Sequence, residues 1–171
     1  MAAKHKDPQD LFAGSDFVVT KTLFEAPALS FLPNIFQDEK SRRWAVAFPG
    51  AVPAIFAYGD LLTAELVEEA SIDIKQIDDK KTLFKQILTN PGRVSRAGAG
   101  ADGRMSPGMT LRLSVESDRA DDGVAELAIP IITRPVRKSS FTYRQLVRFG
   151  ENLRDEFLAM RDAAAPEKVS R

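Results

Sequence analysis

The alternation of apolar and polar residues is most regular in the last third of the chain. Residues 109–116 read M-T-L-R-L-S-V-E, a strict alternation that predicts a half-buried β-strand. After a turn rich in Asp and Gly, the apolar run at residues 124–132 predicts a second strand. Residues 140–160 then carry an apolar stripe at helical spacing, with Gly150 in its middle, where the helix backbone can approach a sheet closely. This region therefore predicts a strand, a turn, a strand and a closing amphipathic helix.

Shorter strands are predicted in the first half of the chain. Residues 31–36 and 43–48 flank the polar stretch 37–41, which is the pattern of a β-hairpin with a polar loop. Residues 52–58 and 62–68 predict two more strands. Strands with one apolar face and a helix with one apolar stripe must bury these surfaces against each other, in a common core. We expect this core to contain Trp44, Val46, Leu111, Leu113, Val115, Leu127, Ile129, Leu153 and Phe157.

The composition narrows the classes of function. The 171 residues, 44% of them hydrophobic, suit one domain with a sizeable core. Lys plus Arg and Asp plus Glu both number 24, and this zero net charge argues against a dedicated nucleic-acid-binding protein. There is no cysteine, which excludes disulfides and thiolate chemistry within the chain. His5 is the only histidine, so one chain cannot build a histidine triad or a two-histidine metal site.

The domain organisation follows from the distribution of polar segments. We expect a flexible N-terminal tail at residues 1–16, a single domain at 17–162 with an insertion at about 79–108, and a polar C-terminal tail at 163–171. No apolar run approaches the ~20 residues that span a bilayer, and the N-terminus lacks the apolar stretch of a signal peptide. We therefore expect a cytoplasmic protein without a transmembrane segment.

The strongest local charge bias lies in the predicted insertion. Apolar residues at 83, 84, 87 and 88 recur at helical spacing, and a glycine-rich loop at 93–108 follows. The candidate interaction surface consists of the cations around them: Lys80, Lys81, Lys85, Arg93, Arg96 and Arg104. Such a segment suits anionic lipid headgroups, an acidic partner or a nucleic-acid backbone. The alternative is a short helix docked on the core with a solvated basic side.

No catalytic, cofactor-binding or metal-binding pattern stands out. The acidic turn at residues 118–123 lacks the register of a calcium loop. The glycines at 98–103 are followed by a strand and not by a helix, so they do not form a phosphate-cradling loop. The carboxylates Asp60, Glu65, Glu68 and Glu69 are candidates for general acid and base, although a solvated face explains them better. We predict no catalytic residues, no cofactor and no metal.

Several soft motifs occur in a recognisable order. An aromatic-Gly-Asp-Leu-Leu segment lies at 58–62, a Glu-Leu-Val-Glu-Glu strand at 65–69, a glycine-rich insertion at 97–108 and a basic Ser-Ser-Phe-x-Tyr helix start at 137–143. This order resembles the C-terminal domain of uncharacterised bacterial proteins that often carry a small zinc ribbon, a domain similar to bacterial pleckstrin-homology-like barrels. The resemblance implies an α+β fold in which two bent antiparallel sheets are closed by a C-terminal amphipathic helix. Without cysteine, this chain has no zinc ribbon of its own.

The function predicted from these observations is that of a binding module and not of an enzyme. We expect a non-catalytic binding or scaffold module that recruits a protein partner or an anionic membrane surface. A homo-oligomer is compatible with this prediction. One alternative is a nucleic-acid-binding sheet module that uses the basic segment at 80–104. Another is a small enzyme with carboxylates on the rim of the barrel.

Overall fold

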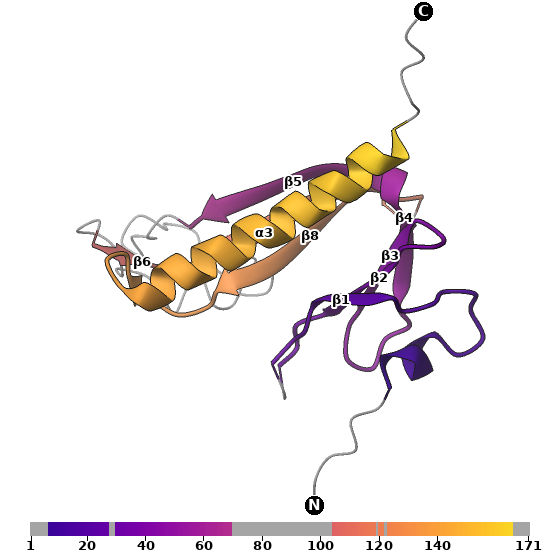
Figure 1. Cartoon of the computed structure of the whole chain (residues 1–171), viewed down its shortest axis with the longest axis horizontal. Coiled ribbons are helices and arrows are strands. Elements are labelled where there is room, and N and C mark those ends of the chain that lie inside the picture. Colours follow the sequence, from indigo (N-terminus) through magenta and orange to yellow (C-terminus); the bar gives the residue numbers. More distant parts are fainter. Residues whose placement is uncertain (1–6, 28–29, 70–103, 119, 122, 166–171) are drawn as a thin grey trace, which may run out of the picture. The chain divides into compact units, whose positions relative to one another are not determined.

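The computed structural model describes residues 7–27, 30–69, 104–118, 120–121 and 123–165. The described chain is α+β (Figure 1). Its elements in chain order are η1 (Pro8–Phe12), β1 (Lys21–Phe24), β2 (Asn34–Asp38), β3 (Arg43–Ala47), β4 (Ala54–Ala57), η2 (Tyr58–Asp60), β5 (Leu61–Glu68), β6 (Met105–Ser106), β7 (Met109–Glu116), β8 (Val124–Ile132), β9 (Val136–Arg137) and α3 (Phe141–Ala164). The predicted hairpin, the two strands after residue 108 and the closing helix are confirmed.

The described strands form three sheets. The first has the order β1-β2-β3-β4 with antiparallel neighbours, the second the order β5-β7-β8, and the third pairs β6 with β9. An α+β fold with antiparallel sheets and a C-terminal helix was predicted and is confirmed. Two bent sheets that form a barrel were also expected, but the described strands do not close into one.

The chain divides into two compact units. Unit 1 contains residues 1–63, 114–125 and 156–171, and unit 2 contains residues 64–113 and 126–155. Eight of the nine predicted core residues are buried, and Leu127 is half-buried. They divide between the units, with Trp44, Val46, Val115 and Phe157 in unit 1 and Leu111, Leu113, Leu127, Ile129 and Leu153 in unit 2.

The core of unit 1 is built on both faces of β3. Trp44 is fully buried and stacks on Phe56 at 4.8 Å between ring centroids, while Phe157 of α3 meets it edge-on at 5.1 Å. On the other face Ala45 and Ala47 lie in a cluster with Phe12, Phe17 and Phe36. Part of the predicted N-terminal tail is therefore packed on the sheet. Apolar side chains cover both faces of β3. Its sequence therefore alternates large and small apolar residues, and not apolar and polar ones.

In unit 2 the helix α3 lies along strands β5 and β8 (Figure 1). Its start is capped by Ser140, whose Oγ accepts a hydrogen bond from the backbone N–H of Tyr143 at 3.1 Å. A Cβ atom added at Gly150 would lie 2.9 Å from Cδ1 of Leu66 and 3.3 Å from Cγ2 of Ile131. The close approach predicted at Gly150 is confirmed.

The contact at Gly150 leads to a first prediction. We expect Gly150→Leu to lower the free energy of unfolding by about 1–3 kcal/mol, because the larger side chain overpacks the contact with Leu66 and Ile131. Gly150→Ala is the matched control. Its gain of about 1 kcal/mol in helix propensity offsets the displacement of a flexible Leu66 methyl group, so its net effect should be small. Urea denaturation measures both variants, and equal stability of Gly150→Leu and wild type would contradict the close packing.

Candidate functional site

The two-stranded sheet of unit 2 brings separate basic residues together. Met105 of β6 lies opposite Arg137 of β9, and Ser106 lies opposite Val136. The backbone N–H of Lys138 extends this pairing by donating to the carbonyl oxygen of Arg104 at 3.0 Å. Residues directly opposite each other in an antiparallel pair have neighbouring side chains. The pairing therefore places the side chains of Arg104 and Lys138 next to each other, while Arg137 lies opposite Met105.

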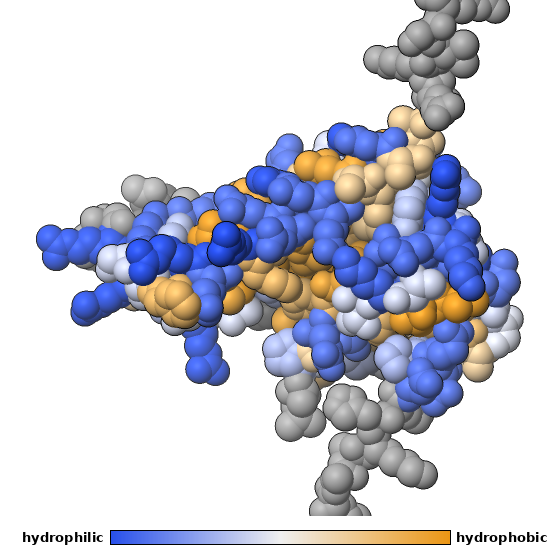
Figure 2. All heavy atoms as spheres, viewed as in Figure 1, coloured by the Kyte–Doolittle hydropathy of each residue, from blue (hydrophilic) through white to orange (hydrophobic). Residues whose placement is uncertain are grey.

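A groove of about 500 Å³ lies at this sheet. Its described lining consists of Arg104, Met105, Arg137, Lys138 and Ser139. Three of these five residues carry a cation and one carries a hydroxyl group, and none of the five is acidic. Figure 2 shows hydrophilic residues gathered around the part of unit 2 that contains β6 and the first turn of α3. This chemistry suits an anionic ligand.

The start of α3 is joined directly to β9. Ser140 donates both its backbone N–H and its Oγ–H to the carbonyl oxygen of Arg137, at 2.9 and 2.7 Å. The same Oγ caps the helix, so Ser139 and Arg137 are held at the helix N-terminus. The helix macrodipole leaves a partial positive charge there. It adds to the charge of the cationic side chains.

Lys138 of this groove has an acidic partner. The Nζ atom of Lys138 lies 2.9 Å from Oε2 of Glu68, and the hydroxyl of Tyr143 donates to the other oxygen at 3.4 Å. Burial raises the pKa of Glu68, but hydrogen bonds from Lys138 and Ser106 outweigh it, so that this pKa lies below its usual value. The hydrogen bond to Glu68 in turn raises the pKa of Lys138. Lys138 is thus held in place as a cation, beside the exposed side chains of Arg104 and Arg137.

Only one of the six predicted surface residues lies in the described chain. Arg104 lines the groove. Lys80, Lys81, Lys85, Arg93 and Arg96 lie outside the described residues. The prediction missed Arg137 and Lys138 as partners of Arg104. Their basic character is visible at the start of the helix motif, but nothing local in the sequence pairs this motif with residue 104.

Most of the candidate catalytic carboxylates form hydrogen bonds or ion pairs within the fold. Asp60 accepts a hydrogen bond from the backbone N–H of Ala57 at 2.7 Å. Glu69 is buried and accepts from the hydroxyl of Thr110 at 2.8 Å. Glu68 is paired with Lys138, and Glu65 is exposed. Within the described part of the chain, no group of three or more histidine or acidic residues is arranged to hold a metal ion.

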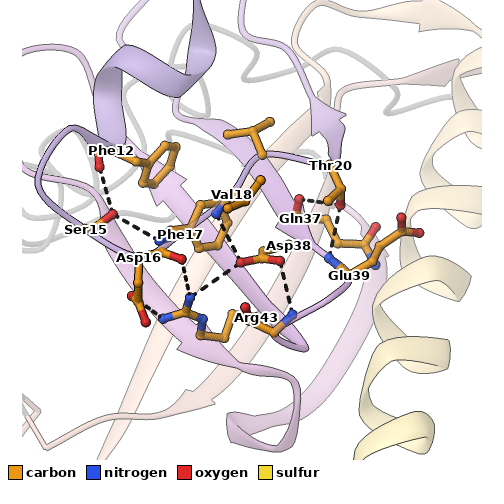
Figure 3. Close-up of polar contacts among 12 residues, drawn as sticks. Phe12, Ser15, Asp16, Phe17, Val18, Thr20, Gln37, Asp38, Glu39 and Arg43 are labelled. Carbon is orange, nitrogen blue, oxygen red and sulfur yellow. Dashed lines mark hydrogen bonds and ion pairs between the residues drawn. The ribbon is translucent and has the colours of Figure 1, made fainter.

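A buried carboxylate that the sequence did not indicate lies at the end of β2 (Figure 3). Asp38 was expected in a polar loop, yet it is fully buried. It accepts hydrogen bonds from the backbone N–H groups of Val18 and Ser41, both at 3.1 Å, and from Arg43 at 3.4 Å. The guanidinium of Arg43 also bonds the side chain of Asp16 at 2.8 Å. The cluster joins the N-terminal arm to the hairpin, which is a structural role.

Comparison of the chain with protein-family models, with curated proteins and with solved structures finds no match. Among the described residues no helix is both long enough and apolar enough to cross a membrane. The groove is therefore the feature of this chain from which a function can be inferred.

Proposed function

We propose that this chain is a non-catalytic binding module whose β6–β9 groove receives the anionic headgroups of a membrane surface. The observation that carries the proposal is the convergence of Arg104, Arg137 and Lys138 in one groove at the N-terminus of α3. Phosphate and carboxylate groups are bound by such combinations of guanidinium, ammonium and helix N-terminus. The structural partners of Asp60, Glu68 and Glu69 support a non-catalytic role for these carboxylates.

We also propose a pleckstrin-homology-like fold for the module. The order of elements supports it, because four antiparallel strands are followed by a three-stranded sheet and a C-terminal helix. The resemblance in sequence implies the same order.

The expected affinity is modest. Each Lys or Arg near an anionic membrane contributes ~1 kcal/mol, and salt screens this attraction. A few cations in one groove, with Lys138 already paired with Glu68, therefore supply a weak and salt-sensitive attachment. Such a groove suits reversible recruitment of the protein to a membrane and not tight binding of a single lipid.

Charge reversal at the groove tests the proposal. We expect Arg137→Glu to lower the partition coefficient onto vesicles containing phosphatidylserine by about tenfold, because it removes one attractive charge and adds a repulsive one. The measurement is co-sedimentation with these vesicles and with neutral phosphatidylcholine vesicles, at low and at moderate salt. Lys40→Glu is the matched control, since it makes the same change in net charge at an exposed position of unit 1.

Three outcomes contradict the proposal. One is equal vesicle binding by wild type and Arg137→Glu. Another is an equal loss in Lys40→Glu, which would mean that only net charge matters. The third is no vesicle binding by the wild type together with binding to duplex DNA or RNA, which favours the nucleic-acid alternative.

A further inference from the structure

Strand β4 leaves one edge of the four-stranded sheet open. It is the last strand of the order β1-β2-β3-β4, and no described strand pairs with its outer side. In the ladder between β3 and β4, Trp44 lies opposite Phe56 and Arg43 lies opposite Ala57. The next pair in this register is Arg42 and Tyr58, and the backbone N–H of Tyr58 donates to the carbonyl oxygen of Arg42 at 3.0 Å. Hydrogen-bonded and non-hydrogen-bonded pairs alternate in an antiparallel ladder. Residues 54, 56 and 58 therefore bond to β3, and residues 55 and 57 direct their N–H and C=O groups outward.

The direction of the Ala57 backbone N–H agrees with this alternation. This N–H donates away from β3, to Oδ2 of Asp60 at 2.7 Å. Ile55 is the other outward-facing residue, and its side chain is 37% exposed. An N–H and a C=O group directed outward from an edge strand form a ready template for another chain.

A groove of about 240 Å³ runs along this edge in unit 1. It is lined by residues 54–56 of β4, by Asp60 and by residues 116–118 after β7. Among the described lining residues the charged ones are Asp60, Glu116 and Asp118, all of them acidic. Glu116 and Asp118 are exposed. The groove thus combines an open backbone edge, an apolar side chain and negative charge.

We infer that the edge of β4 binds an extended basic segment of a partner protein as an added strand. The backbone of the segment pairs with the outward N–H and C=O groups of Ile55, while its Lys or Arg side chains reach Glu116 and Asp118. Backbone pairing supplies affinity in this mode of recognition, and side chains supply specificity. The charge of the groove selects basic over acidic segments. This surface is opposite in charge to the β6–β9 groove, and the inference does not depend on the function proposed there.

A change in the edge strand tests the backbone pairing. The probe is a fluorescein-labelled, capped peptide, Lys-Val-Arg-Val-Lys-Val, titrated with the full chain and followed by fluorescence anisotropy. We expect Ile55→Pro to weaken binding by about tenfold, because it removes an outward donor and leaves a peptide carbonyl unpaired. Proline is tolerated at a sheet edge and removes no bond to β3 here. Ile55→Val keeps the donor and should bind like the wild type.

Two changes in the peptide keep the test independent of how a protein variant folds, and a third measurement changes the charge of the groove. The same peptide, N-methylated at every residue, has lost its backbone donors and should bind wild type about tenfold more weakly. A peptide with Glu in place of Lys and Arg should not bind. The Glu116→Gln/Asp118→Asn double variant should bind the basic peptide more weakly and with less dependence on salt.

Two results overturn the inference. The first is binding that is the same for the plain and the N-methylated peptide, which leaves only charge attraction. The second is absence of binding by wild-type protein that a thermal melt shows to be folded.

Discussion

Replacing Phe157 with alanine is expected to lower the free energy of unfolding by about 3–5 kcal/mol. Phe157 is fully buried in unit 1, and its ring meets Trp44 edge-on at 5.1 Å. Trp44 in turn stacks on Phe56. The substitution therefore leaves a cavity beside the largest side chain of the core and removes an aromatic contact at the same time.

Urea denaturation monitored by tryptophan fluorescence is a direct measurement, since Trp44 is the only tryptophan of the chain. Phe149→Ala is the matched control on the same helix. Phe149 is 42% exposed, and its replacement should cost less than about 1 kcal/mol. Similar losses in the two variants would mean that Phe157 does not occupy the core position described here.

Replacing Asp38 with alanine is the second substitution with a large expected effect, a loss of about 2–4 kcal/mol in the free energy of unfolding. The carboxylate of Asp38 is buried and accepts from the backbone N–H groups of Val18 and Ser41 and from Arg43. Alanine leaves both backbone donors without this acceptor. It also removes one of the two carboxylates that pair with Arg43, which is only partly exposed and still donates to the carboxylate and the carbonyl oxygen of Asp16.

The pH dependence of the free energy of unfolding distinguishes the contribution of the Asp38 charge from that of its side-chain packing. Burial raises the pKa of Asp38, but hydrogen bonds from Val18 and Ser41 outweigh it and hold this pKa below 3.8. Since the folded state prefers the ionised form, the stabilisation is present above pH 3.8 and is lost as the pH falls through the lowered value. Asp38→Asn cannot ionise and should lose less stability on acidification than wild type. Parallel pH dependence of denaturation in both proteins would contradict this role.

The elements that the sequence predicted are those with a local period. The alternation at β7, the apolar run at β8 and the helical stripe of α3 all appear in the structure. Each depends on side chains that alternate across a strand or recur on one face of a helix, so a short window of sequence contains the signal. Gly150 belongs to this group, because a glycine inside an apolar helical stripe already indicates close packing.

The burial of Asp38 could not be predicted from the local sequence pattern. A polar run between two apolar strands predicts a loop, yet Asp38 ends β2 and is covered. Its partner Val18 lies in the N-terminal arm, 20 residues earlier in the chain. A buried carboxylate is tolerated only where such donors satisfy it. Their position follows from packing and not from the residues next to Asp38.

By itself the sequence determined an α+β chain with a hairpin, two long strands and a closing helix, because these depend on local periodicity. The tertiary structure alone decided which charges meet. Arg104 joins Arg137 and Lys138 in one groove only because β6 pairs with β9, and Glu116 and Asp118 line a groove with β4 only because the fold brings residues 116–118 to that groove. Pairing between distant segments depends on how the whole chain packs, and no local period encodes it.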